Sequence, residues 1–364
     1  MQRTIAVDLG PRSYDVRVGA GLLDELGQAV ADLPDVTSTV VISDSTVAEL
    51  YAGRAVRSLT AAGLAASAIE FPAGEANKTL ATAGKLFDRL FAIEPPVDRS
   101  CVIVALGGGV AGDLVGFVAA TALRGMRFVQ CPTTLLADVD ASVGGKTGVD
   151  HPAGKNLIGA FHQPSGVLID VAALKTLPEA ELINGLAECV KHAVIRDAEL
   201  LGLIEDSAEA ILACDGEVMA DLVTRNVAIK AAVVAADERE SGERAHLNFG
   251  HTIAHAIEAL VGFGEISHGQ AVALGMVAAC RLATTRGLIE EEAAQRIEDV
   301  LAALKLPVRR DGLDAHQIWR IMQHDKKARG GQVRMVLPVV LGQVAVFDDI
   351  TPRAVTDAVT YLAR

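Results

Sequence analysis

The sequence predicts two parts of different fold class: an α/β part with a mostly parallel sheet, followed by an all-α part. Two observations support this division. The first half alternates short apolar runs rich in β-branched residues with stretches suited to helices, a pattern typical of a parallel sheet covered on both faces. After Pro178, long segments rich in Ala, Leu and Glu carry apolar residues at helical spacing, which indicates packed helices.

The individual elements follow from these patterns. Five apolar runs have the length and composition of strands: residues 39–43, 68–71, 101–106, 127–131 and 167–170. Three long segments have helical periodicity: residues 179–195, 208–236 and 269–286. The boundary falls at Leu177 and Pro178, because a residue before proline disfavours helix and proline suits a first helical turn. We therefore expect an α/β domain at 1–177 and a helical domain at 178–364.

Composition limits the classes of function. With 364 residues, 51% of them hydrophobic, the chain can bury a large core. Its formal net charge of −13 argues against nucleic acid or an anionic membrane as a partner, so a local cation cluster would serve a small anionic ligand. Five cysteines without a C-x-x-C motif indicate reduced thiols in a cytoplasmic protein. Asp8 precedes any apolar stretch of signal-peptide type, and no apolar run reaches membrane-spanning length.

Two glycine-lysine turns lie within residues 132–156. They are Gly144-Gly145-Lys146 and Gly154-Lys155-Asn156, with little apolar bulk between them. Glycine lets the backbone approach a ligand and expose its N–H groups, so the pair is suited to hold an anion such as phosphate. A Walker P-loop is excluded because Asp140 stands where its first glycine is required. Two solvated turns that happen to carry lysines are the alternative.

A third glycine-rich segment, residues 106–113 (LGGGVAGD), directly follows a predicted strand and matches G-x-G-x-x-G. A glycine turn that leads into a helix N-terminus binds pyrophosphate in Rossmann-like domains, so a dinucleotide is the leading hypothesis. A plain strand-to-helix turn is the alternative, because no acidic residue ends a strand about twenty residues later. Asp44, after an earlier strand, could hold the ribose instead. Another polar turn, with Glu75 and Lys78, would face the same crevice.

Metal-binding residue types gather in the helical half. Glu188, His251, His255 and His268 lie in otherwise apolar segments, and two histidines with one glutamate are a known catalytic zinc set. Glu188 and His192 are spaced i, i+4, as are His251 and His255, so either pair could share a helix face. Spacing alone does not choose among them.

Lysine and arginine residues also occur in apolar or acidic settings. Lys230 interrupts the apolar run 227–236, where a charge is costly without an anion to meet it. Other candidates of this kind are Arg124, Lys191, Arg244, Lys326 and Lys327.

Taken together, these segments resemble the 3-dehydroquinate synthase family, a branch of the sugar phosphate cyclases. The resemblance covers nearly the whole chain, through ordered blocks that include PAGEANK, GGGVAGDLVGF, DVDASVGGKTGVDHPAGKNLIGAF, GLAECVKH, HLNFGHTIAHAIE, HGQAV and DKK. It implies the two-domain dehydroquinate synthase-like fold, with NAD in the α/β domain and a zinc or cobalt ion in the helical domain. It also implies a homodimer.

The resemblance assigns residues to each group. The positions that match NAD-binding residues are Asp44, Glu75, Lys78, Gly108, Gly109, Val110, Asp113, Thr133, Thr134, Lys146, Lys155, Leu174 and Thr176. The implied metal ligands are Glu188, His251 and His268, with His192 and His255 outside the ligand set. The implied catalytic residues are Lys146, Lys155, Asn156, Lys191, Glu240 and His255; those implied for substrate binding are Arg124, Asp140, Lys230, Arg244, Asn248 and Lys326. Arg124 would come from a neighbouring subunit.

The implied reaction converts 3-deoxy-D-arabino-heptulosonate 7-phosphate into 3-dehydroquinate and phosphate, a step of the shikimate pathway to aromatic amino acids. Oxidation by NAD, β-elimination of phosphate, reduction and an intramolecular aldol closure would follow one another. Residues 132–156 would form one wall of the site and the metal ligands the opposite wall. Two positions depart from the family pattern: Gln270 stands where H-G-E is usual, and Ala254 replaces a usual glycine. The Gln270 change is expected to affect metal tuning at most.

Three other interpretations remain open. The chain could be another sugar phosphate cyclase, of valiolone or deoxyinosose type, but Lys230 and Arg244 favour a substrate with a carboxylate. It could be a metal-dependent polyol dehydrogenase, although a phosphate-free polyol would not need so many basic residues. A non-catalytic oligomeric binding module would not need metal ligands beside a nucleotide turn.

Overall fold

The computed structural model describes residues 2–239, 242–262, 264–327 and 333–363, and it divides into two compact units. The first contains Met1–Leu177 and Met219–Ala235, and the second contains Pro178–Val218 and Ala236–Arg364. The division at Leu177 and Pro178 coincides with the expected domain boundary. The segment Met219–Ala235, however, groups with the first unit, whereas the sequence analysis placed it in the second.

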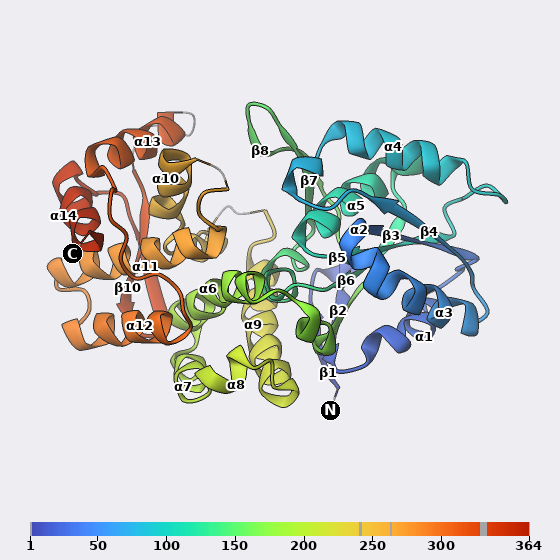
Figure 1. Ribbon diagram of the computed structural model, residues 1–364, viewed down its shortest axis with the longest axis horizontal. Coiled ribbons are helices and arrows are strands. Elements are labelled where there is room, and N and C mark those ends of the chain that lie inside the picture. The colour runs from blue at the N-terminus through green and yellow to red at the C-terminus, as the bar shows by residue number, and fades with distance from the viewer. Residues whose placement is uncertain (1, 240–241, 263, 328–332, 364) are drawn as a thin grey trace. The chain divides into compact units, whose positions relative to one another are not determined.

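The first unit is built on a seven-stranded sheet with the strand order β1-β2-β9-β6-β5-β3-β4 (Figure 1). Only β1 and β2 pair antiparallel; all other neighbours are parallel, which confirms the mostly parallel sheet. The strands are β1 (Arg3–Val7), β2 (Tyr14–Gly19), β3 (Ser38–Asp44), β4 (Ala65–Phe71), β5 (Cys101–Gly107), β6 (Arg127–Pro132) and β9 (Gly166–Asp170). The five predicted strands correspond to β3, β4, β5, β6 and β9.

Helices cover both faces of this sheet because successive strand residues point to opposite sides. In β3, Val40 and Ile42 pack in one core with α4 and α5, while Val41 packs in the other core with α1 and α3. The central strand β5 is buried at every residue. The helices are α1 (Leu26–Ala31), α3 (Gly53–Ala61), α4 (Leu80–Phe91) and α5 (Gly109–Thr121).

Shorter segments complete the first unit. An antiparallel hairpin, β7 (Lys146–His151) and β8 (Gly154–Phe161), lies outside the main sheet. The short helical segments are η1 (Gly10–Arg12), η2 (Leu22–Asp24), α2 (Ser45–Val47), η3 (Ala48–Ala52), η4 (Glu75–Asn77), η5 (Ala122–Arg124), η6 (Ala137–Ala141) and η7 (Val171–Thr176). Most of α9 (Gly216–Ala236) also belongs here, and Arg3 near the N-terminus forms an ion pair with Asp221 on this helix.

The second unit is helical, as predicted, with one hairpin that the sequence analysis did not anticipate. Its helices are α6 (Glu179–Arg196), α7 (Ala198–Asp206), α8 (Ala208–Leu212), η8 (Glu243–Asn248), α10 (His251–Val261), α11 (His268–Thr285), α12 (Glu291–Ala303), α13 (Ala315–Lys327) and α14 (Pro352–Leu362). The hairpin pairs β10 (Met335–Val340) with β11 (Gln343–Phe347) antiparallel. The predicted helix at 208–236 is interrupted: α8 ends at Leu212, and Asp215 Oδ1 accepts bonds from the first turn of α9.

Helix α11 forms the centre of the second unit, and thirteen of its residues are buried. Its neighbours approach closely because two positions lack a side chain. A Cβ on Gly275 would lie 2.0 Å from the carbonyl oxygen of Gly250, and one on Gly269 would lie 2.1 Å from that of Asn184. Ala254, which replaces a usual glycine, is fully buried at the same contact with α11. Among the described residues, no helix is both long and apolar enough to cross a membrane.

Candidate cofactor and metal sites

The residues expected to bind NAD cluster at the carboxyl ends of the parallel strands of the first unit. Asp44 ends β3, Gly108 follows β5 and Thr133 follows β6. Glu75 and Lys78 come after β4, while Leu174 and Thr176 come after β9. Because the strands are parallel, these positions meet at one edge of the sheet, which is where ligands of open α/β sheets bind.

The glycine turn after β5 has little room for side chains. Gly107 adopts φ +149°, and a Cβ there would lie 2.7 Å from Ala111 Cβ. A Cβ on Gly108 would lie 2.9 Å from Thr134 Cγ2. Gly108 is the N-cap of α5 and offers no capping side chain, so the first N–H groups of this helix remain available to an anion such as a pyrophosphate. This cradle fits the dinucleotide hypothesis.

Asp44 lies beside this turn. Its Oδ1 accepts hydrogen bonds from Thr46 N at 3.0 Å and Val47 N at 3.1 Å, which caps α2. Its Oδ2 would lie 3.1 Å from a Cβ on Gly107. One carboxylate oxygen therefore fixes the local backbone while the other faces the glycine turn. The ribose contact expected for Asp44 remains a prediction.

Lys78 is a buried charge that joins three parts of this edge. Its Nζ lies 2.6 Å from Asp113 Oδ2 on α5 and 2.6 Å from Asn156 Oδ1 on β8. Its carbonyl oxygen accepts a bond from Asp150 N on β7 at 2.8 Å. Burial alone lowers the pKa of Lys78, but the Asp113 carboxylate raises it above its ordinary value. The network fixes the hairpin relative to the glycine turn.

The two glycine-lysine turns lie at opposite ends of one hairpin. Lys146 begins β7 and pairs with Phe161, whereas Lys155 lies beside the hairpin tip, where His151 pairs with Gly154. Lys146 and Asp150, which are four positions apart along β7, are separated by about 13 Å at roughly 3.3 Å per residue. The intervening residues form the two strands of the hairpin and so separate the two backbone turns. The phosphate role of their side chains remains a prediction. The Nζ atom of Lys155 lies 3.4 Å from Oε1 of Glu75.

Lys230 also has an anionic partner within the first unit. Its Nζ lies 2.5 Å from Asp140 Oδ1 and 2.7 Å from the carbonyl oxygen of Asp140. The side chain of Lys230 is almost fully buried, so this contact meets the requirement that a charge in an apolar helix face needs an anion. The family resemblance implies that Lys230 also meets a substrate carboxylate, and that role remains a prediction.

In the second unit, three of the candidate metal ligands come together. Glu188 on α6 is buried, and Oε1 lies 3.4 Å from His251 Nε2 and 3.8 Å from His268 Nε2. Donor atoms around one zinc ion at 2.0–2.2 Å are about 3.3–3.6 Å apart, so this spacing suits a metal with little adjustment. Oε1 has no hydrogen-bond partner among the described residues, as expected of a carboxylate whose partner is a cation.

Charges around Glu188 keep it ionised. Lys191, one helical turn further along α6, forms an ion pair with Glu188 Oε2. Burial opposes ionisation, but Lys191 and the two histidines hold the pKa of Glu188 well below its ordinary value. An ionised carboxylate is the form that binds a metal.

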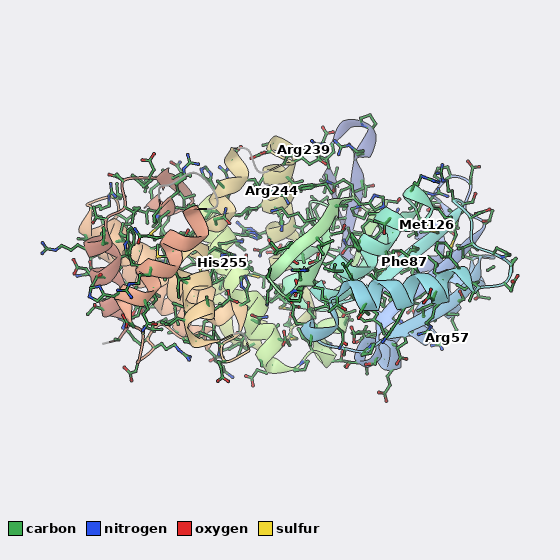
Figure 2. All side chains as sticks on the ribbon, turned by 90° about the horizontal axis from the view of Figure 1, so that it is seen from above. Arg57, Phe87, Met126, Arg239, Arg244 and His255 are labelled. Carbon is green, nitrogen blue, oxygen red and sulfur yellow. The ribbon has the colours of Figure 1, made fainter. Side chains whose placement is uncertain are left out.

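The other histidines have different environments. His251 Nδ1 lies 3.1 Å from the carbonyl oxygen of Phe249, a contact that leaves Nε2 as the ligand atom. The rings of His251 and His255 meet edge to face, with centroids 5.6 Å apart. His255, which is labelled in Figure 2, is exposed, whereas His192 is fully buried on α6. Glu188, His251 and His268 form one group whose ligand atoms lie close enough to hold a metal ion, and their role as the ligands remains a prediction.

One residue of this centre, Glu258, was not predicted from the sequence. It lies on the same face of α10 as His251 and His255, and its Oε1 is 3.5 Å from His268 Nδ1. The signal was present in the sequence as a carboxylate seven residues after His251, at helical spacing. Gln270, by contrast, forms a capping box with Ser267 at the start of α11.

The remaining predicted residues are placed as follows. Arg244, which is labelled in Figure 2, lies in η8. It is buried and donates a hydrogen bond to the carbonyl oxygen of Glu238. Asn248 ends the same segment and is half-buried. Arg124, in the first unit, is exposed and adopts φ +64°. Glu240 and the side chain of Lys326 lie outside the described residues.

Comparison with known proteins gives the same family for both parts of the chain. The family model described as 3-dehydroquinate synthase N-terminal matches residues 68–184, and the one described as 3-dehydroquinate synthase C-terminal matches residues 185–328. A 3-dehydroquinate synthase of Desulforamulus reducens is 47% identical over 348 residues, which cover 95% of this chain and 96% of the relative.

Solved structures are similar over the same length. A 2-epi-5-epi-valiolone synthase from Streptomyces hygroscopicus, solved with NAD⁺ and Zn²⁺ bound, aligns with a TM-score of 0.86 at 30% identity and covers 99% of both chains. A 2-deoxy-scyllo-inosose synthase, complexed with carbaglucose-6-phosphate, NAD⁺ and Co²⁺, aligns with a TM-score of 0.87 at 26% identity, covering 98% of this chain and 99% of the other.

Proposed function

The chain belongs to the 3-dehydroquinate synthase family, and from this premise we propose that it converts 3-deoxy-D-arabino-heptulosonate 7-phosphate into 3-dehydroquinate and inorganic phosphate. The structural observation that carries the proposal is the buried Glu188 carboxylate, which faces His251 and His268 within the range of metal ligands. The glycine turn before α5 supports it independently.

NAD and a divalent metal, Zn²⁺ or Co²⁺, are the proposed cofactors, which would make the protein a phosphate-eliminating lyase that regenerates its NAD. Bound NAD would supply a reversible hydride acceptor for the substrate. A bound metal would supply a Lewis acid for substrate hydroxyl groups. Gly108 and Gly109 would give the dinucleotide close access to the backbone, while Glu188, His251 and His268 would hold the metal.

The other side chains would bind and orient the substrate. Lys146, Asn156, His255 and Lys326 are proposed to face the phosphate. Arg244 and Lys230 are proposed to face the carboxylate, because a guanidinium can bind a planar carboxylate through two hydrogen bonds. Lys155, Lys191 and Glu240 are proposed to act near the reacting carbons, and Asp140, Asn248 and Arg124 to complete substrate binding.

Two residues of the proposed site, Asn156 and Glu188, contact lysines that fix the position of the first and the charge of the second. Lys78 holds the Asn156 amide oxygen at 2.6 Å, which fixes that side chain before a phosphate arrives. Lys191 keeps Glu188 ionised through its ion pair, so the metal ligand carries its charge at neutral pH.

A coupled assay tests the proposal. Purified protein is incubated with the heptulosonate phosphate, catalytic NAD and zinc, and phosphate and 3-dehydroquinate are measured together. Equal amounts of both products and no net NADH are expected. Absence of phosphate release would overturn the proposal, and stoichiometric NADH would identify a dehydrogenase instead.

A second substrate distinguishes this activity from that of related cyclases. The chain is 47% identical to a 3-dehydroquinate synthase, but 30% to the valiolone synthase and 26% to the inosose synthase. A seven-carbon sugar phosphate that lacks the carboxylate should therefore turn over poorly. Faster turnover of that sugar than of the heptulosonate would favour a valiolone-type enzyme.

We also propose a cytoplasmic homodimer in which Arg124 of one subunit serves the site of the other. Arg124 is exposed and adopts φ +64° next to Gly125. Mixing the inactive variants Arg124→Ala and Lys155→Ala would then restore activity, since a mixed dimer contains one intact site. Free exchange should give about a quarter of wild-type activity. Mixing that restores nothing would place Arg124 in its own subunit's site or outside the reaction.

A further inference from the structure

We propose that Glu258 is a positioning residue of the metal centre: its carboxylate holds the imidazole of His268 through Nδ1, so that Nε2 points toward Glu188. The inference rests on the metal role proposed above for His268. It goes beyond that role, because it assigns a function to a carboxylate that contacts a ligand and not the metal.

The geometry gives each ring nitrogen of His268 its own carboxylate. Nδ1 lies 3.5 Å from Glu258 Oε1, and Nε2 lies 3.8 Å from Glu188 Oε1. The two carboxylates come from different helices, α10 and α6. His268, the first residue of α11, is therefore fixed from both sides, with Nδ1 as the protonated nitrogen and Nε2 as the ligand atom.

The burial of Glu258 supports this role. Its side chain is only 11% exposed, and a carboxylate so buried needs a donor. A carboxylate that accepts the Nδ1 proton of a ligating imidazole fixes the orientation of the ring and makes Nε2 a stronger metal ligand.

Gln270 cannot supply this contact. Its side-chain Oε1 accepts a hydrogen bond from Ser267 N at 3.0 Å, and its own N–H is bonded to Ser267 Oγ at 3.3 Å. Glutamate and glutamine serve equally as the third residue of such a capping box. The glutamine at this position therefore preserves the helix start, and Glu258 provides the carboxylate for His268.

A second metal ion is the competing explanation for Glu258. Ligand atoms of His255, Glu258 and His268 lie within 4.8 Å of one another, so Glu258 could in principle be a ligand itself. The two explanations differ in stoichiometry. A positioning role predicts one metal ion per chain, whereas a ligand role predicts two.

Metal titration of the full-length protein distinguishes them without substrate or NAD. The variants Glu258→Ala and Glu258→Gln are compared with Gln270→Glu, a matched change close to the same histidine. Zinc affinity is measured by competition with a chromophoric chelator, and the visible spectrum of the Co²⁺ form reports ligand geometry. Thermal unfolding of the metal-free forms shows whether each variant folds.

We expect one equivalent of zinc for the wild type and about 10- to 100-fold weaker binding by Glu258→Ala. Glu258→Gln keeps an acceptor of nearly the same volume and should lose less, with an altered Co²⁺ spectrum. Gln270→Glu should bind within about threefold of the wild type, because it keeps the capping box. Wild-type affinity in both Glu258 variants would overturn the inference, and so would two equivalents that fall to one in Glu258→Ala.

His268→Ala separates failure of this inference from failure of the proposed function. If His268→Ala loses zinc and Glu258→Ala does not, only the positioning role is wrong. If His268→Ala binds zinc like the wild type, the proposed metal site is wrong and the inference about Glu258 is overturned with it.

Discussion

The two units carry their candidate residues in different ways. In the first unit the residues expected to bind NAD lie in turns at the ends of parallel strands. In the second unit Glu188 lies within α6, and His251 and His268 are the first residues of α10 and α11. Turns expose backbone N–H groups that suit a long, flexible cofactor, whereas helices fix side-chain atoms within a few tenths of an ångström, as a metal requires. The difference predicts that the two functions can be damaged separately.

The largest loss of activity should come from a change in the candidate metal ligands of the second unit. Replacing Glu188 by Gln removes the charge that faces two histidines, so we expect loss of bound zinc and a decrease in activity of about a thousandfold or more. The dissociation constant for NAD, measured by isothermal titration calorimetry, should stay within a few-fold of that of the wild type. Equal losses of zinc and NAD binding would contradict the separation.

The converse change lies in the glycine turn. Gly108→Ala places a methyl group 2.9 Å from Thr134 Cγ2, at the start of α5, and we expect NAD to bind about tenfold more weakly. The zinc content should be unchanged. Gly84→Ala is the matched control, because a Cβ at that position meets no atom within 4 Å.

A smaller effect is expected from the network that links the turn to the hairpin. Lys78→Met leaves the Asp113 carboxylate and the Asn156 amide without their shared donor. We expect the free energy of unfolding to fall by about 2 kcal/mol or more, together with a lower kcat. Lys85→Met on the exposed face of α4 should change neither quantity appreciably, and a similar loss in both variants would exclude a specific role for the network.

The smallest effect concerns Asp138, a carboxylate of the first unit that no proposed function uses. It is buried, and neither oxygen has a hydrogen-bond partner among the described residues. Burial raises its pKa well above the ordinary value, so the folded state binds this proton more tightly than the unfolded state does. Stability is therefore highest below the ordinary pKa and falls as pH rises toward the folded-state pKa.

Asp138→Asn should stabilise the protein by about 1–2 kcal/mol at neutral pH, because it removes the charge penalty. The gain should shrink as the pH is lowered, since Asp138 is then neutral in both states. Urea unfolding at several pH values measures this trend, and the exposed Asp348→Asn serves as control. A gain that does not depend on pH would contradict the assignment.

Much of the first unit was predictable because its signals are local. A buried apolar strand followed by glycines, as at 101–109, indicates both an element and a ligand edge. The hairpin at β7 and β8 was missed for the same reason: its glycines suggested open turns, but Gly148 and Gly159 face each other across the ladder, where a Cβ on Gly159 would lie 2.2 Å from Thr147 O. Close strand contact, rather than a ligand, explains those two glycines.

The second unit was less predictable because its centre is assembled from three helices. No spacing within one helix could choose His251 over His255 or Glu188 over His192; that choice depends on where α6 and α11 pack against α10. Glu258 was overlooked because a glutamate on a helix is ordinarily solvated, and only tertiary packing buries it. The location of residues 219–235 was hidden for a similar reason, since helical periodicity does not reveal which core a helix joins.

Helix α9 has a consequence for how the protein is made. The chain leaves the first unit after Leu177, returns at Met219 and leaves again after Ala235. A ribosome that has released only the first 177 residues has therefore not yet supplied Lys230, the partner of Asp140. The first unit can be completed only after more than forty residues of the second have emerged. A gene cut at the apparent domain boundary would therefore encode an unfinished first half.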